Sequence, residues 1–236
     1  MTKGSGTRSG LLWEVERLLN EVENLPQVLL MENVPQVHSK ANMSDFQKWI
    51  DFLSSKGYSN YWKDLNAKNY GVAQNRNRCF MVSILGDYQY EFPKRISLIK
   101  MLKDYLEENV EKRYYLSESR VRSLFEHKRR NTEKGNGFGA RIVSYNDISS
   151  SLTTSPHKSA GQYFMGEDGR IRTLTPKESY RLMDFTDQDF HKAESVNSNT
   201  QLYKQAGNSI VRNVLVAIIG QMLQGNEEIY KGVIHQ

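Results

Sequence analysis

The chain has 236 residues, 38% of them hydrophobic and 25% charged, an ordinary globular composition with room for one large core or two small ones. Its formal net charge of +5 suits a polyanionic partner but does not by itself separate nucleic-acid binding from a generically basic surface. The single cysteine, Cys79, excludes an internal disulfide, the histidine spacing predicts no metal site, and we expect neither a signal peptide nor a membrane span.

The first predicted elements are a helix, a strand and a second helix. Leu11 to Asn20 carries apolar residues at helical spacing. Val28 to Met31 is a short, wholly apolar run, which is typical of a buried parallel strand. A second helix contains Phe46 and ends before Gly57.

Two further strands follow, at Tyr58 to Leu65 and at Cys79 to Leu85. This order of strand, helix, strand and strand predicts a layered α/β sheet. Polar groups at the carboxyl ends of such strands are where active sites collect. Glu32 and Asn33, directly after the first strand, and the segment before Cys79 are therefore candidate site residues.

The composition changes at Phe92. Between Phe92 and Arg170, charged and partly helical stretches give way to Gly-rich loops and short β-branched runs, which predicts a separate, smaller, mostly β unit. A helix then begins with Thr175 as N-cap, Pro176 in the first turn and Glu178 at the capping-box position. A final apolar helix is predicted from Ile210 to Leu223.

Two polar segments suggest base or anion chemistry. The Glu32 carboxylate, next to the Asn33 carboxamide, can accept or share a proton with a ring nitrogen of a bound base; the alternative is a pair that only orders a loop. Gln74, Arg76 and Arg78 face one way on an extended segment. Buried guanidiniums require a phosphate, a carboxylate, a base carbonyl or a structural ion-pair partner, and the sequence leaves these open.

A third segment, Gln205 to Ser209, precedes the final helix. Small and polar residues before a helix N-terminus can present amides and side chains to a cofactor. The alternative is a simple N-cap at Asn208 or Ser209.

In their order, these segments resemble the motif set of the DNA (cytosine-5) methyltransferases. The set comprises Glu32 to Val34, Gln74 to Arg78, Arg172 to Glu178 and Lys204 to Ser209. Gly6 to Leu12 is similar to the segment that follows the catalytic loop in that family, and the resemblance runs from near residue 4 to about Leu223. It therefore identifies the chain as similar to the C-terminal half of such an enzyme, including its target-recognition domain.

The resemblance implies an α/β fold with a partial Rossmann-like methyltransferase sheet, containing only the C-terminal strands. A smaller, mostly β target-recognition domain is inserted before the final helices. The implied divisions are residues 1–91 for part of the catalytic domain, 92–170 for target recognition and 171–236 for the return to the catalytic domain.

The resemblance also implies a reaction. In this family a cysteine thiolate adds to C6 of a flipped cytosine, and S-adenosyl-L-methionine supplies a methyl group to C5. Glu32 would steady or protonate ring N3, with Asn33 as its positioner. Arg78 would contact the ring carbonyl and a phosphate, Arg76 would support it, and Gln74 would be a structural or catalytic-loop partner.

Cofactor and double-stranded DNA contacts are implied elsewhere. Asn208, Ser209 and Leu11 match positions near the S-adenosyl-L-methionine site. In the variable region, a basic run and the Gly135 to Gly139 loop are candidate phosphate contacts, although the run can also be a solvated helix end. The candidate DNA-binding residues are Lys128, Arg129, Arg130, Thr153, Thr154, His157 and Lys158.

The family's Gly-rich cofactor motif and its Pro-Cys nucleophile motif would precede the first residue of this sequence. Cys79 begins an apolar strand, so we expect it in the core rather than as the nucleophile. We therefore expect an N-terminal methyltransferase polypeptide to supply both motifs and to cover an open, apolar edge of the strand ending at Glu32. Without that polypeptide, we expect the chain to aggregate or fold poorly.

The sequence leaves three functions open. The chain is part of a split DNA cytosine-5 methyltransferase, an inactive DNA-binding module, or the remnant of a disrupted gene. A variant of the family acts on tRNA, and the long variable region favours DNA. We expect a cytoplasmic protein of prokaryotic or phage origin.

Overall fold

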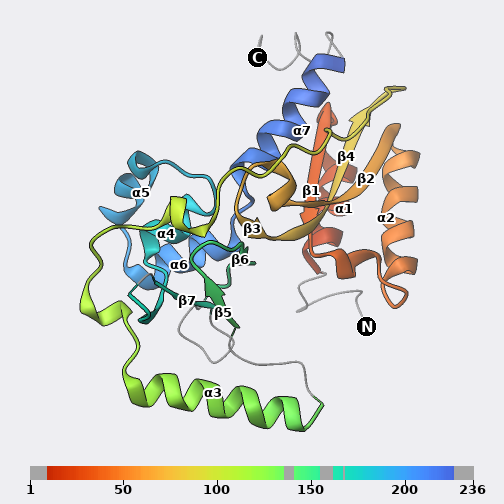
Figure 1. The fold of residues 1–236 in the computed structure, drawn as a ribbon. Coiled ribbons are helices and arrows are strands. Elements are labelled where there is room, and N and C mark those ends of the chain that lie inside the picture. Colours follow the sequence, from red (N-terminus) through yellow and green to blue (C-terminus); the bar gives the residue numbers. More distant parts are fainter. Residues whose placement is uncertain (1–9, 136–140, 155–161, 167, 226–236) are drawn as a thin grey trace. The chain divides into compact units, whose positions relative to one another are not determined.

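The structure is a computed structural model that describes residues 10–135, 141–154, 162–166 and 168–225. The chain divides into two compact units (Figure 1). The first unit comprises Met1–Asp64, Arg78–Phe92 and Gln221–Gln236, and the second comprises Leu65–Asn77 and Pro93–Gly220. The three predicted divisions follow the family resemblance rather than compactness, and they stay a prediction.

A three-stranded sheet of order β1-β4-β2 forms the first unit. Its strands are β1 (Val28–Asn33), β2 (Tyr58–Asn66) and β4 (Asn77–Leu85). The predicted buried parallel strand is wrong on two counts, because β1 pairs antiparallel with β4 and none of its residues is fully buried. An apolar run indicates that a segment is apolar, but it does not indicate whether the strand pairs parallel or antiparallel. Among the described strands β1 lies at the edge of the sheet, where Leu30 is 38% exposed.

Two helices pack on one face of this sheet (Figure 1). They are α1 (Gly10–Glu21) and α2 (Met43–Ser55), with the short helix η1 (Pro35–His38) between β1 and α2. Their core cluster contains Leu19, Phe46, Trp49, Leu53, Tyr58, Cys79 and Met81. Because side chains alternate along a strand, Cys79 and Met81 face the helices while Arg78 and Phe80 face the other way. The predicted end of α2 is confirmed, since Gly57 follows it with a left-handed φ of 90°.

The second unit contains two small sheets and several helices. A parallel pair joins β3 (Gln74–Asn75) to β6 (Ser149–Ser150). A sheet of order β5-β7-β8 joins β5 (Arg141–Ser144), β7 (Gln162–Met165) and β8 (Ile171–Thr173). Short helical turns are η2 (Ala67–Tyr70), η3 (Leu102–Tyr105) and η4 (Lys112–Tyr114).

The predicted mostly β character of residues 92–170 is wrong for the described part of that range. It contains α3 (Glu118–Glu133), a 16-residue helix begun by Ser117, whose side chain accepts a hydrogen bond from Arg120 N. Only Leu124 of α3 is buried, so the helix has almost no apolar face. Sequence periodicity identifies helices by such a face, and α3 lacked that signal.

Four helices follow β8: α4 (Pro176–Arg181), α5 (Asp187–Glu194), α6 (Asn199–Asn208) and α7 (Arg212–Gly225). The predicted capping box of α4, Thr175 with Glu178, is confirmed. The predicted N-cap at Asn208 or Ser209 is wrong, because Asn208 ends α6 and Ser209 is its C-cap.

The stretch Asn199–Gln224 is long and apolar enough to cross a membrane when judged by length and composition alone. In the fold, the extended backbone at Ser209 (φ −72°, ψ 160°) divides it into separate helices of 10 and 14 residues. Each is shorter than the roughly 20 residues that a membrane-spanning helix needs.

Candidate active site

Glu32 and Arg78 form an ion pair at one end of the sheet in the first unit. Arg78 Nε lies 3.1 Å from Glu32 Oε1, and each side chain is 19% exposed. Glu32 pairs with Phe80 in the β1–β4 register, so Arg78 lies diagonally opposite on the same face. A carboxylate and a guanidinium are therefore held together where a ligand from solvent can reach both.

Asn33, the last residue of β1, is exposed. Its Oδ1 accepts a hydrogen bond from the Val34 backbone N–H at 2.8 Å, which orders the turn after β1. Its predicted role in positioning Glu32 stays a prediction.

Cys79 is fully buried in the core cluster, as the sequence predicted. Burial, together with the smaller effect of the negative charges of Asp64 and Glu32, raises the pKa of its thiol to about 12. A thiol with this pKa stays protonated near neutral pH, so it is a poor nucleophile there.

Arg76 is buried in the second unit, with an exposed fraction of 4%, and its hydrogen bonds link separate segments of the chain. Its NH2 group donates to the backbone oxygens of Gly207 at 3.0 Å and of Ser209 at 2.8 Å. Its NH1 group donates to Leu152 O at 3.2 Å and to Ser151 Oγ at 3.3 Å. The acceptors that a buried guanidinium requires are therefore backbone carbonyls, and they fix the end of α6 against the segment after β6.

Gln74 is fully buried and also links distant segments through hydrogen bonds to backbone groups. Its Nε2 donates to Leu182 O at 2.7 Å, and its Oε1 accepts from Leu152 N at 3.1 Å. The predicted alternation is visible in the burial, because Asn75 and Asn77 are exposed while Gln74 and Arg76 are buried.

Gly207 brings two predicted segments together. A Cβ atom at this position would lie 2.6 Å from Thr153 C and 2.6 Å from Thr154 N. A candidate cofactor segment and a candidate DNA segment are thus in backbone contact. Asn208 is exposed, and Ser209 Oγ donates to Ile210 O at 3.2 Å.

Of the other predicted residues in these segments, Thr153 is exposed and Thr154 is half-buried. The backbone of Leu11 lies in α1, but its side chain is outside the described residues.

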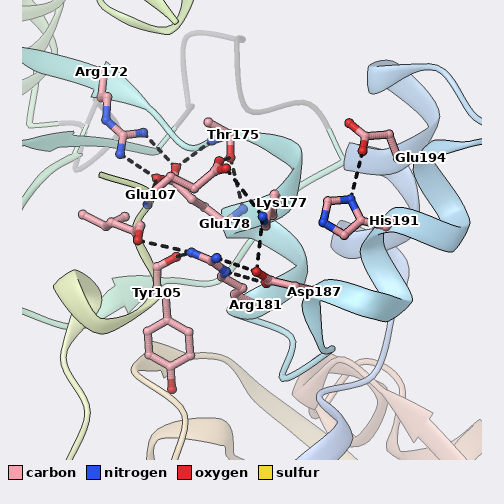
Figure 2. A network of polar contacts seen from close by, with 11 residues as sticks. Tyr105, Glu107, Arg172, Thr175, Lys177, Glu178, Arg181, Asp187, His191 and Glu194 are labelled. Atoms are coloured by element: carbon pink, nitrogen blue, oxygen red, sulfur yellow. Dashed lines mark hydrogen bonds and ion pairs between the residues drawn. The ribbon is translucent and has the colours of Figure 1, made fainter. Parts of the chain in front are cut away.

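Arg172 and Glu178 form a buried bidentate pair (Figure 2). Their nitrogen–oxygen distances are 2.8 Å and 2.6 Å, and the Arg172 guanidinium also lies 4.2 Å from the centre of the Phe164 ring. Glu178 further accepts from the backbone N–H groups of Thr175 and Glu107. This segment therefore connects β8, α4 and the chain near residue 107.

Figure 2 also shows a second charged group beside this pair. Arg181 contacts Asp187 through Nε and NH2, both at 2.7 Å, and Lys177 Nζ lies 3.2 Å from the same carboxylate. The hydrogen bonds from Arg181, followed by that from Lys177, hold the pKa of Asp187 well below its usual value.

The predicted basic run lies on the second half of α3, where Lys128, Arg129 and Arg130 are exposed. Arg129 Nε lies 3.5 Å from Glu133 Oε1 across one helical turn. A solvated helix face and a phosphate-binding face both fit this geometry. His157, Lys158 and residues 136–139 of the glycine-rich loop lie outside the described residues.

One cluster in the first unit was missed by the sequence analysis. Ligand-type atoms of His38, Asp64 and Cys79 lie within 4.8 Å of one another. The three residues come from η1, β2 and β4, so no local spacing signals their proximity.

Comparisons with known proteins agree on one family. Residues 2–224 match the family described as C-5 cytosine-specific DNA methylase. The chain is 35% identical over 224 residues to Type II methyltransferase M2.ScrFI of Lactococcus lactis subsp. cremoris and 34% identical over 239 residues to Orphan methyltransferase M.SssI of Spiroplasma monobiae. These matches cover 93% and 94% of this chain but 60% of each relative, so the chain spans about 60% of their length.

Two solved structures share the fold. The S. pombe Dnmt2 methyltransferase matches with a TM-score of 0.73 at 21% identity, covering 92% of this chain and 72% of that one. The Entamoeba histolytica methyltransferase EhMeth matches with a TM-score of 0.73 at 18% identity, covering 91% and 68%. The mixed α/β fold thus has methyltransferases as structural neighbours.

Proposed function

This chain belongs to the C-5 cytosine-specific DNA methylase family, and we propose that it is the C-terminal portion or a subunit of a DNA cytosine-5 methyltransferase. The observation that carries the proposal is the partly exposed pair of Glu32 and Arg78 at the end of β1. When bound, S-adenosyl-L-methionine would supply the methyl group for C5 of a flipped cytosine.

The Glu32–Arg78 pair matches one edge of a cytosine ring. Cytosine presents a ring nitrogen, N3, beside a carbonyl oxygen, O2. The Glu32 carboxyl group would hold the proton at N3, and the Arg78 guanidinium would donate to O2 or to a neighbouring phosphate. A proton held at N3 withdraws electrons from the ring and makes C6 easier for a thiolate to attack.

The described residues fit part of a cofactor site. Asn208 exposes a carboxamide, and the Ser209 carbonyl is held by Arg76 at 2.8 Å. We propose that these two residues contact the cofactor from the end of α6. The role of Leu11 stays a prediction.

The nucleophile is proposed to come from a different segment. Cys79 is the one cysteine of this sequence, and its burial and raised pKa oppose nucleophilic attack. We propose that an N-terminal methyltransferase polypeptide supplies the Pro-Cys motif and the rest of the cofactor site. Its docking position would be the β1 edge, where Leu30 is 38% exposed.

Double-stranded DNA is the proposed substrate. The exposed basic residues of α3, Lys128, Arg129 and Arg130, would contact phosphates. His157 and Lys158 stay predicted to lie close to bases. The names of the relatives, type II methyltransferases among them, favour a restriction-modification role in a bacterial cytoplasm. The same α3 face also supports a second candidate function, which is DNA binding without catalysis.

The test is methyl transfer from labelled S-adenosyl-L-methionine to double-stranded DNA. The chain is assayed alone and with a polypeptide that carries the missing N-terminal motifs. Activity in the mixture alone supports the proposal. Activity of the chain alone would contradict the separate nucleophile, and DNA binding with no transfer in either sample would favour the binding module.

A further inference from the structure

We propose that His38, Asp64 and Cys79 bind a zinc ion on the helix-covered face of the first unit's sheet. The three side chains offer one nitrogen, one oxygen and one sulfur atom, all within 4.8 Å of one another. This mixed donor set suits Zn²⁺, which accepts imidazole, carboxylate and thiolate ligands.

The geometry requires little movement. Zinc bonds of about 2.0–2.3 Å in a tetrahedron place neighbouring ligand atoms about 3.3–3.8 Å apart. His38 Nε2 and Asp64 Oδ1 are 2.9 Å apart, joined by a hydrogen bond. A zinc ion would bind the Nε2 lone pair of a neutral His38, whose ring proton would then lie on Nδ1, and would replace the thiol proton of Cys79, so binding would release one proton to solvent.

The charges favour a divalent cation. One thiolate and one carboxylate, with a neutral imidazole, give a complex with Zn²⁺ that carries no net charge, which lowers the cost of burial. The carboxylates of Asp64 and Glu32 already act electrostatically on Cys79 and disfavour its bare thiolate. A cation beside the sulfur reverses that preference.

The surroundings orient the ligands and leave a path for entry. The His38 ring packs against Trp62, with ring centres 4.8 Å apart, and against Phe46 at 6.2 Å. The side chains of His38 and Asp64 are 22% and 31% exposed, whereas Cys79 is fully buried. A water molecule would take the fourth position from the solvent side.

The proposed zinc site and the candidate catalytic pair lie on opposite faces of the sheet. Asn33 faces Cys79 in the β1–β4 register, and Arg78 precedes Cys79 on β4. Strand alternation places the Cys79 sulfur and the Arg78 guanidinium on opposite faces. Zinc would therefore fix the end of β4 that carries Arg78 without occupying the base-binding face.

The test titrates the metal-stripped full chain, mixed with the N-terminal polypeptide, with Co²⁺, a spectroscopic substitute for Zn²⁺. We expect one Co²⁺ per chain with a thiolate-to-cobalt charge-transfer band that Zn²⁺ displaces. The band should disappear in Cys79→Ser, and His38→Ala should weaken binding by about 100-fold or more. His191→Ala is the matched control, because this exposed histidine also lies beside a carboxylate, Glu194, and its loss should change nothing.

A melting curve keeps the test independent of folding defects in the variants. Zn²⁺ should raise the melting temperature of the unmutated chain and leave that of His38→Ala unchanged. A Co²⁺ spectrum without the thiolate band, or an identical titration for Cys79→Ser and the unmutated chain, would overturn the proposal. The cluster would then be a hydrogen-bonded His–Asp pair beside a core thiol.

Discussion

The arginines of the two units are used in opposite ways. In the first unit Arg78 pairs with Glu32 at a position where both side chains are 19% exposed. In the second unit Arg76 and Arg172 are 4% and 5% exposed and are bound by carbonyl oxygens or by the buried Glu178. In a partly exposed ion pair, either side chain can exchange its partner for a ligand. A fully buried arginine cannot leave its acceptors without a loss of stability.

The difference is notable because Arg76 and Arg78 belong to one alternating motif. Two arginines on one extended segment have similar sequence surroundings, yet the chain passes from one compact unit to the other between them. We therefore propose that Arg78 contacts the substrate and that Arg76 positions the Gly207–Ser209 segment. Substitutions in both units test this difference. All are measured on the chain mixed with the N-terminal polypeptide.

Replacement of Glu32 should have the largest effect. Glu32→Gln removes the group proposed to hold the proton at N3, so methyl transfer should fall by about 10²–10⁴-fold while the melting temperature stays within a few degrees. Glu23→Gln, at an exposed position of the same unit, is the control and should keep full activity. Normal methyl transfer by Glu32→Gln would show that the Glu32 carboxyl group is not needed for the reaction.

Replacement of Arg172 should have the largest effect on stability. Arg172→Met leaves the buried Glu178 carboxylate without its cation, so the free energy of unfolding should fall by about 3–5 kcal/mol. Arg170→Met removes an exposed pair with Asp168 and should leave the free energy of unfolding almost unchanged. Urea unfolding measures both, and equal losses would show that burial does not separate the two kinds of pair.

Gly207 tests how tightly the end of α6 is held. In Gly207→Ala the new methyl group would meet the Thr153 and Thr154 backbone at 2.6 Å, so we expect a loss of about 1–3 kcal/mol. Gly220→Ala, whose Cβ meets nothing within 4 Å in α7, should be neutral or up to about 1 kcal/mol stabilising. An unchanged urea midpoint for Gly207→Ala would contradict the close contact.

Asp187 should have the smallest effect and a defined pH dependence. Its pKa is lowered first by Arg181, so its contribution is present above the unfolded pKa of 3.8 and is lost as pH falls below it. Because the side chain is 44% exposed, solvent screening limits that contribution to less than about 1 kcal/mol. Asp187→Asn should therefore lower stability more at pH 6 than near pH 2, and unfolding at the two pH values is compared by circular dichroism.

Local signals in the sequence predicted local structure well. The capping box of Thr175 and Glu178 and the end of α2 at Gly57 depend on neighbouring residues, and both predictions are confirmed. The core position of Cys79 followed from its apolar strand and is also confirmed.

Long-range and weakly patterned features were not predictable. The direction of β1 depends on its partner β4, and α3 lacks the apolar face that reveals a helix. Arg76 finds its acceptors 131 and 133 residues away at Gly207 and Ser209, which no spacing rule anticipates. The alternating motif predicted that its arginines need acceptors but not which acceptor each would have.

The most direct test of the division is the methyl transfer rate per folded molecule for Arg78→Met, with Arg76→Met as the matched variant. We expect Arg78→Met to lose about 100-fold or more in rate while its urea midpoint is unchanged. Arg76→Met should instead lower the midpoint, because its carbonyl acceptors lose their buried donor. A normal rate for folded Arg78→Met, together with a midpoint as low as that of Arg76→Met, would contradict the account.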